Sequence, residues 1–236
     1  MMRPSIRRFV LPAIAAATAV LLASCVTVNR LDDIRLDGAR LAAVLAPPPP
    51  PSLDTWYDLG FDSHNPIGTV LRIGSSIVLA AEADKAADRM RVALDRVGVP
   101  EVVFEESSAR CARALGANQV RETRDADFVL DIEIEEYGID APSWGAAVSL
   151  DMSVTARLFE RRTHDLVWQR HVSVAQQASP DVFGLPSAAE NIFTAAMLAR
   201  LTTDEMARGF ENLAHYAARA IGNRLERDLT KARGDR

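Results

Sequence analysis

Three stretches between residues 127 and 175 alternate apolar and polar side chains with a period of two. Their apolar members are Phe128, Leu130, Ile132 and Ile134, then Val148, Leu150, Met152, Val154, Ala156 and Leu158, and finally Leu166, Trp168, Val172 and Val174. Because successive side chains of a strand point to opposite faces, the pattern predicts three strands of a sheet with one dry and one wet face. Residues 141–145 and 160–165 are turn-like, so we expect an antiparallel meander.

Two longer segments carry apolar residues at helical spacing, at about 66–97 and about 203–231. The first follows Asn65 and ends before Gly98. The second begins at a capping box of Thr202 and Glu205, with acids in its first turn and bases in its last. Because the dry face of the meander needs a cover, we expect both helices to pack there. The predicted fold class is α+β with a mixed sheet.

Three shorter segments complete the expected domain. The apolar run 41–46 precedes five prolines, Pro47–Pro51, which favour a stiff polyproline II conformation. The prolines are either a spacer above a membrane or the loop that leaves a first core strand at 41–46, and we favour the loop. We expect a short strand at 102–105 and a brief helix from Ser107 to Leu115.

The N-terminus has the three parts of a secretory signal peptide. Basic Arg3, Arg7 and Arg8 precede an apolar run from residue 9 to 22, which is shorter than the roughly 20 residues that span a membrane. The run ends in Leu22-Ala23-Ser24-Cys25. We therefore expect a signal peptide at 1–24, a tether at 25–38 and one periplasmic α+β domain at 39–236.

Leu22-Ala23-Ser24-Cys25 resembles the lipobox of bacterial lipoproteins. The resemblance implies that Cys25 becomes the first residue of the mature chain and carries acyl chains. A cleaved signal with a chance cysteine is the alternative. Val26 follows the cysteine, which favours the periplasmic face of the outer membrane over inner-membrane retention. Cys111 then has no partner within the chain, and we expect a buried, inert thiol.

The net charge of the mature chain limits the classes of partner that it is expected to bind. Residues 1–24 hold three arginines and no acid, so their removal changes the formal net charge from −5 to −8. An acidic domain is a poor candidate for nucleic-acid binding. The charge also argues against a broad electrostatic grip on anionic lipid heads, so we expect attachment through the acyl chains.

We expect no catalytic residues, no metal and no cofactor. The chain lacks a G-x-S-x-G elbow and the H-E-x-x-H spacing. A cleft that brings together Asp62, His64 and Ser75 would instead support an envelope-acting hydrolase. Asp131, Glu133 and Glu135 share one strand face and form either a cation site or a solvated face opposite Arg, Thr and Ser. We favour the solvated face.

Two predicted loops carry large apolar groups. Trp144 and Phe183 are candidate contacts for a protein partner, because exposed aromatic side chains often anchor interfaces. They fold back onto the core in the alternative interpretation.

A family resemblance rests on two segments, Asp125-Ala126-Asp127-Phe128-Val129-Leu130 and the hairpin from Ala156 to Trp168. They resemble the superfamily of periplasmic lipoproteins that includes the curli-secretion pore subunit and the activators of peptidoglycan synthases. His164 replaces the usual glycine of the turn. A second, looser similarity is to auxiliary lipoproteins of lipid-trafficking transporters. Both imply a non-enzymatic module of an envelope assembly or transport system that binds an envelope protein, with a self-assembling ring as another possibility.

Overall fold

The computed structural model of the 236-residue chain describes residues 27–54, 77–140, 147–186 and 193–234. Seven strands form one mixed sheet in the order β1-β7-β6-β5-β2-β4, and β3 also pairs with β5. The strands are β1 (Val28–Asn29), β2 (Arg40–Leu45), β3 (Ser52–Asp54), β4 (Asn118–Gln119), β5 (Phe128–Asp140), β6 (Ser149–Glu160) and β7 (Leu166–Gln177). The helices are α3 (Ile77–Val97), α4 (Val99–Leu115), α5 (Ala195–Leu198) and α6 (Thr203–Gly234), with 3₁₀ turns η2 (Thr123–Asp125) and η3 (Pro180–Phe183).

The predicted meander is confirmed as β5, β6 and β7, which pair antiparallel in sequence order. Leu130 lies opposite Leu158, and Leu158 lies opposite Trp168. All three side chains are fully buried. The alternation therefore places the apolar positions on one face, where they form the core.

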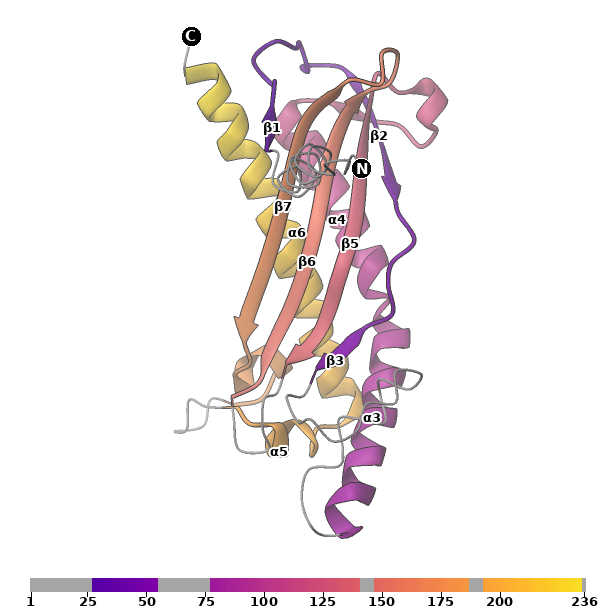
Figure 1. Ribbon diagram of the computed structural model, residues 1–236, viewed down its shortest axis with the longest axis vertical. Coiled ribbons are helices and arrows are strands. Elements are labelled where there is room, and N and C mark those ends of the chain that lie inside the picture. Colours follow the sequence, from indigo (N-terminus) through magenta and orange to yellow (C-terminus); the bar gives the residue numbers. More distant parts are fainter. Residues whose placement is uncertain (1–26, 55–76, 141–146, 187–192, 235–236) are drawn as a thin grey trace, which may run out of the picture.

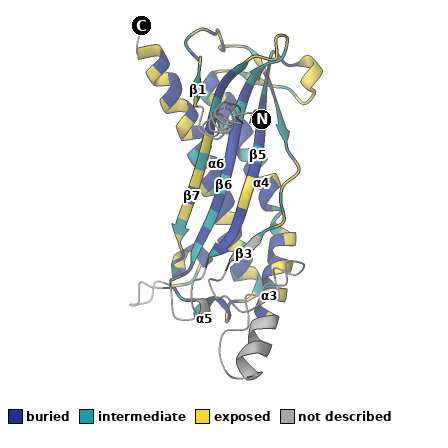
Figure 2. Ribbon diagram, in the orientation of Figure 1, coloured by how far each residue is buried: buried dark blue, intermediate teal, exposed yellow. Residues whose placement is uncertain are grey.

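Helices α4 and α6 run behind one face of the elongated sheet, and α3 extends beyond the end of the sheet near β3, where it packs against α6 (Figure 1). The apolar stripe of α6 is buried at Phe210, Leu213, Ile221 and Leu225 against the meander and α4, and its polar side is exposed (Figure 2). Thr202 caps α6, because its hydroxyl accepts from the Glu205 amide while the Glu205 carboxylate accepts from Thr202. The α+β prediction is confirmed, and the part of the expected helix 66–97 before Ile77 lies outside the described residues. No helix of the described ranges has the length and apolar character needed to cross a bilayer.

The short strand predicted at 102–105 is wrong, because these residues belong to α4. Gly98 adopts a left-handed conformation, with φ of 60°, and separates α3 from α4. Pro100 lies in the first turn of α4, where a helix needs no amide donor. The sequence Gly98–Pro100 therefore ends one helix and starts the next, and the brief helix expected at 107–115 is the end of α4.

The apolar run at 41–46 forms β2, which pairs parallel with β5 through Leu41 to Leu45. Pro47–Pro51 then connects β2 to β3. Strand β3 also pairs parallel with β5, but at the other end of β5, at Gly138 to Asp140. The favoured interpretation of the prolines, a loop within the domain, is therefore correct.

The tether expected at 25–38 is wrong for its described part. Val28 and Asn29 pair with β7, and the Arg30 amide donates to the Val167 carbonyl at 2.8 Å. Leu31 and Leu36 are each only 2% exposed. Burial of these two side chains stabilises the segment against the domain, so Val28 to Leu36 belong to the folded domain.

Cys111 is fully buried on α4, as expected. Burial raises the pKa of its thiol to about 12. Since the thiolate is the reactive form, this cysteine is inert in the folded protein.

Candidate functional site

The sheet face opposite the helices carries polar side chains from all three strands of the meander. It is built from the outward-facing positions of the meander, and we call it the open sheet face. Its polar members are Asp131, Glu133, Glu135 and Glu136 on β5, Asp151, Ser153, Thr155 and Arg157 on β6, and His171 and Ser173 on β7.

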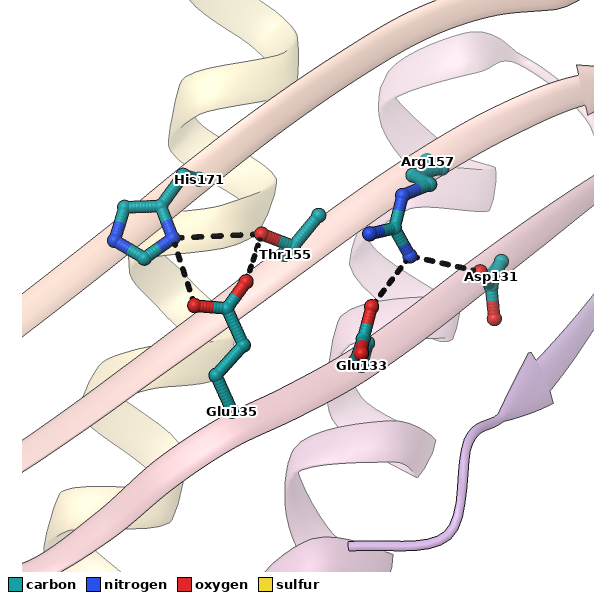
Figure 3. A network of polar contacts seen from close by, with 6 residues as sticks. All are labelled: Asp131, Glu133, Glu135, Thr155, Arg157 and His171. Carbon is teal, nitrogen blue, oxygen red and sulfur yellow. Dashed lines mark hydrogen bonds and ion pairs between the residues drawn. The ribbon is translucent and has the colours of Figure 1, made fainter. Parts of the chain in front are cut away.

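Arg157 joins two carboxylates across the β5–β6 ladder (Figure 3). Its Nη1 lies 2.6 Å from Glu133 Oε2 and 3.2 Å from Asp131 Oδ2. Partial burial lowers the pKa of Arg157, but the hydrogen bonds that it donates to both acids outweigh that effect and raise the pKa. The guanidinium is therefore a permanent positive charge between two of the three carboxylates that share this strand face.

Glu135 reaches its partners because of a β-bulge. The pairing of β5 with β6 shifts between Ile134 and Glu136, so Glu135 is the extra residue. Thr155 Oγ1 donates to Glu135 Oε1 at 2.5 Å, and His171 Nδ1 lies 3.3 Å from Glu135 Oε2 (Figure 3). The cross-strand arrangement of acids with Arg and Thr that the sequence favoured is thus present.

The Thr155, His171 and Glu135 group does not have the geometry of a nucleophilic triad. A triad places the nucleophile and the orienting acid on different nitrogens of the histidine ring. Here Thr155 Oγ1 and Glu135 Oε2 both approach Nδ1, at 3.4 and 3.3 Å. The hydroxyl donates to the Glu135 carboxylate, so its proton does not point at the His171 ring and the histidine is not placed as its general base.

The open sheet face is acidic as a whole. Among the members named above, five are carboxylates (Asp131, Glu133, Glu135, Glu136 and Asp151) and one, Arg157, is a permanent cation. No cluster of three or more potential metal ligands occurs among the described residues. The arrangement suits a basic or hydrogen-bonding partner that lies along the three strands.

Phe183, predicted as a partner contact, is instead a core residue. It is 1% exposed, and its ring stacks on Phe193 with centroids 4.7 Å apart. The left-handed Gly184 ends η3 and turns the chain so that the ring points inward against α6.

Trp144, Cys25 and the group Asp62, His64 and Ser75 lie outside the described residues.

A buried polar cluster escaped the sequence analysis. Asp228 of α6 accepts from Trp168 Nε1 at 3.0 Å and from Arg170 Nε at 2.6 Å. Asn29 Nδ2 donates to the Asp228 carbonyl at 3.2 Å. This cluster fastens β1, β7 and α6 together at one end of the sheet. The sequence does contain a signal for this cluster. Arg170 and Asp228 are charged residues at positions where the alternation of β7 and the stripe of α6 predict side chains that face the core.

No family model and no curated protein matches the chain. A Xanthomonas campestris protein of the DUF330 family has 15% identity and a TM-score of 0.36, over 86% of this chain and 90% of its own. A hypothetical protein from Chlamydia trachomatis has 13% identity and a TM-score of 0.38, over 81% and 98%. The LpoB C-terminal domain from Salmonella enterica has 15% identity and a TM-score of 0.15, over 66% and 90%. These likenesses are too distant to assign a family or a function.

Proposed function

We propose that the chain is a lipid-anchored, non-enzymatic accessory protein of the bacterial envelope, attached through Cys25. In this proposal the open sheet face binds another component of an assembly or transport system. The lipobox resemblance and Val26 support a place on the periplasmic face of the outer membrane.

One observation carries the proposal. Within the described ranges, helices cover one face of the meander, and the other face is polar and acidic and carries no described helix. Arg157 and Thr155 hold three of the acids in fixed positions across the strands. Positioned charges of one sign favour specific recognition of a complementary partner.

Site-specific crosslinking in living cells tests the proposal. A photo-reactive amino acid replaces Ser173, which is exposed on the open sheet face, or Glu105, which is exposed on α4. We expect capture of one defined envelope protein from position 173 and not from position 105. Capture of a second copy at position 173 would favour the ring-forming alternative.

A charge-neutralised variant sharpens the test. Glu135→Gln together with Glu136→Gln removes two acids of the face and keeps the side-chain size. We expect weaker capture at position 173 from this variant. Equal capture from positions 173 and 105 would reject the open sheet face as the contact surface. Equal capture at position 173 from the parent and the neutralised variant would reject it as well.

A further inference from the structure

The outer side of α6, turned away from the sheet, changes its charge along the helix. Its first half exposes acids and bases together, as in Asp204, Arg208 and Glu211. Its second half is almost purely cationic, and its one exposed acid is Glu226. We call this second half the basic face, with Arg219, Arg224, Arg227, Lys231 and Arg233 as its cations.

Neither ion pairing nor the helix dipole accounts for the basic face. Arg224 lies 3.6 Å from the buried Asp228, but within the described residues no carboxylate pairs with Arg219, Arg227, Lys231 or Arg233. The helix dipole favours cations only in the last turn, which holds Lys231 and Arg233. Arg219 and Arg227 therefore remain unexplained by either effect, on a chain with a formal net charge of −5.

Two shallow hollows lie on part of the basic face, between Gly222 and Lys231. Arg227, Thr230 and Lys231 line a hollow of about 610 Å³, which also includes Asn223 and Glu226. A second hollow of about 210 Å³ shares Asn223 and Glu226 and adds Arg110 and Arg113 at the end of α4. Tyr216 is 42% exposed at the other end of the face, with the guanidinium of Arg219 6.0 Å from its ring centroid. Cations around a shallow groove beside an exposed tyrosine match the chemistry of a membrane surface, where phosphates meet apolar chains.

The half of α6 that carries the basic face lies beside β1, the first described strand. Val28 is the first residue of β1, and the neighbouring Asn29 contacts the backbone of Asp228 on α6 (Figure 1). Cys25 precedes Val28 by three residues, which span at most about 10 Å when fully extended. An acyl anchor at Cys25 therefore keeps the bilayer close to this part of α6.

We infer that the basic face of α6 rests on the membrane and binds the head groups of anionic phospholipids. This inference rests on the proposed lipid anchor, and it adds the orientation of the domain relative to the bilayer. Because α6 lies behind the sheet, contact of its outer side with the bilayer turns the open sheet face toward the periplasm. The acidic partner surface and the basic membrane surface then lie on opposite sides of the domain.

Vesicle binding tests the inference without the acyl chains. The mature chain with Cys25→Ser keeps every described element and cannot be lipidated. We expect it to bind vesicles of phosphatidylglycerol, to lose this binding at high salt, and not to bind phosphatidylcholine. Arg227→Glu with Lys231→Glu should weaken the binding at least about tenfold, since each basic residue near an anionic surface contributes about 1 kcal/mol.

Arg121→Glu with Arg124→Glu is the matched control. It makes the same change in net charge, but both residues are exposed beside β4, at the opposite edge of the sheet from β1. We expect this control to bind within about twofold of the parent, since distant charges are screened. Equal weakening by both pairs, or no binding of phosphatidylglycerol by the parent, would overturn the inference. So would a change of oligomeric state, with unchanged vesicle binding, in the α6 variant. The mass of the native N-terminus tests the anchor separately.

Discussion

Arg170 on β7 and Asp228 on α6 form a buried ion pair, with Arg170 Nε 2.6 Å from Asp228 Oδ2. The two residues are 8% and 7% exposed. Trp168 donates to the same carboxylate oxygen, and Asn29 donates to the backbone carbonyl of Asp228. The pair therefore holds together the strand that follows Cys25, the edge of the meander and the helix that carries the basic face.

Removal of the Asp228 carboxylate should destabilise the whole domain. Asp228→Ala leaves the buried guanidinium of Arg170 without its partner, and we expect a loss of about 3–5 kcal/mol in the free energy of unfolding. Glu226→Ala, an exposed neighbour on α6, should change it by less than about 0.5 kcal/mol. Urea unfolding followed by circular dichroism measures both. Equal effects of the two variants would show that the buried pair is not formed.

The same pair should make stability depend on acid pH. Burial raises the pKa of Asp228, but the hydrogen bonds from Arg170 and Trp168 outweigh it and hold the pKa below its ordinary value of 3.8. The stabilisation is therefore complete above the ordinary pKa and is lost as the pH falls through the lower, folded-state value. Unfolding free energies measured from about pH 5 to about pH 2 should fall more steeply for the native chain than for Asp228→Asn. Parallel curves would contradict this assignment.

Gly209→Ala should test the inward position of Phe183. Alanine normally stabilises a helix relative to glycine, by up to about 1 kcal/mol. At Gly209 a Cβ would lie 2.3 Å from Phe183 Cε1, so we expect destabilisation of about 1–3 kcal/mol instead. Gly234→Ala is the control, because a Cβ there meets nothing within 4 Å. A stabilising Gly209→Ala would mean that Phe183 is free to leave the core.

Leu31→Ala distinguishes a packed N-terminal segment from a tether. Truncation of this buried side chain should cost about 2–3 kcal/mol, whereas Arg35→Ala, in the same segment but exposed, should cost less than about 0.5 kcal/mol. Thermal unfolding monitored by calorimetry gives both values. If the segment were a flexible tether, neither substitution would change the free energy of unfolding measurably.

The sequence predicts the meander and α6 well, because the alternation and the α6 stripe directly report which positions face the core. It mistakes Val102–Glu105 for a strand, because a short apolar run next to Gly98 and Pro100 is ambiguous without knowledge of the backbone at Gly98. In the structure Pro100 lies in the first turn of a helix. The sequence alone does not distinguish a proline that starts a helix from one that follows the end of a helix.

The polar features were harder to predict than the apolar ones. The alternation predicts that Asp131, Glu133 and Glu135 share one strand face, but it does not predict the bulge that directs Glu135 toward Thr155 and His171, which depends on strand register. Arg170 lies two residues after Trp168 on the same, core-facing side of β7, where the alternation predicts an apolar side chain. Its partner is 58 residues away on α6, and pairing over that separation is a property of the tertiary fold.

Mass spectrometry of the intact protein, purified from the membranes of its own cells, tests the lipid anchor most directly. The account predicts a chain that begins at Cys25 and carries acyl groups on that residue. A chain that begins at Cys25 with a free thiol, or that retains residues 1–24, would contradict it.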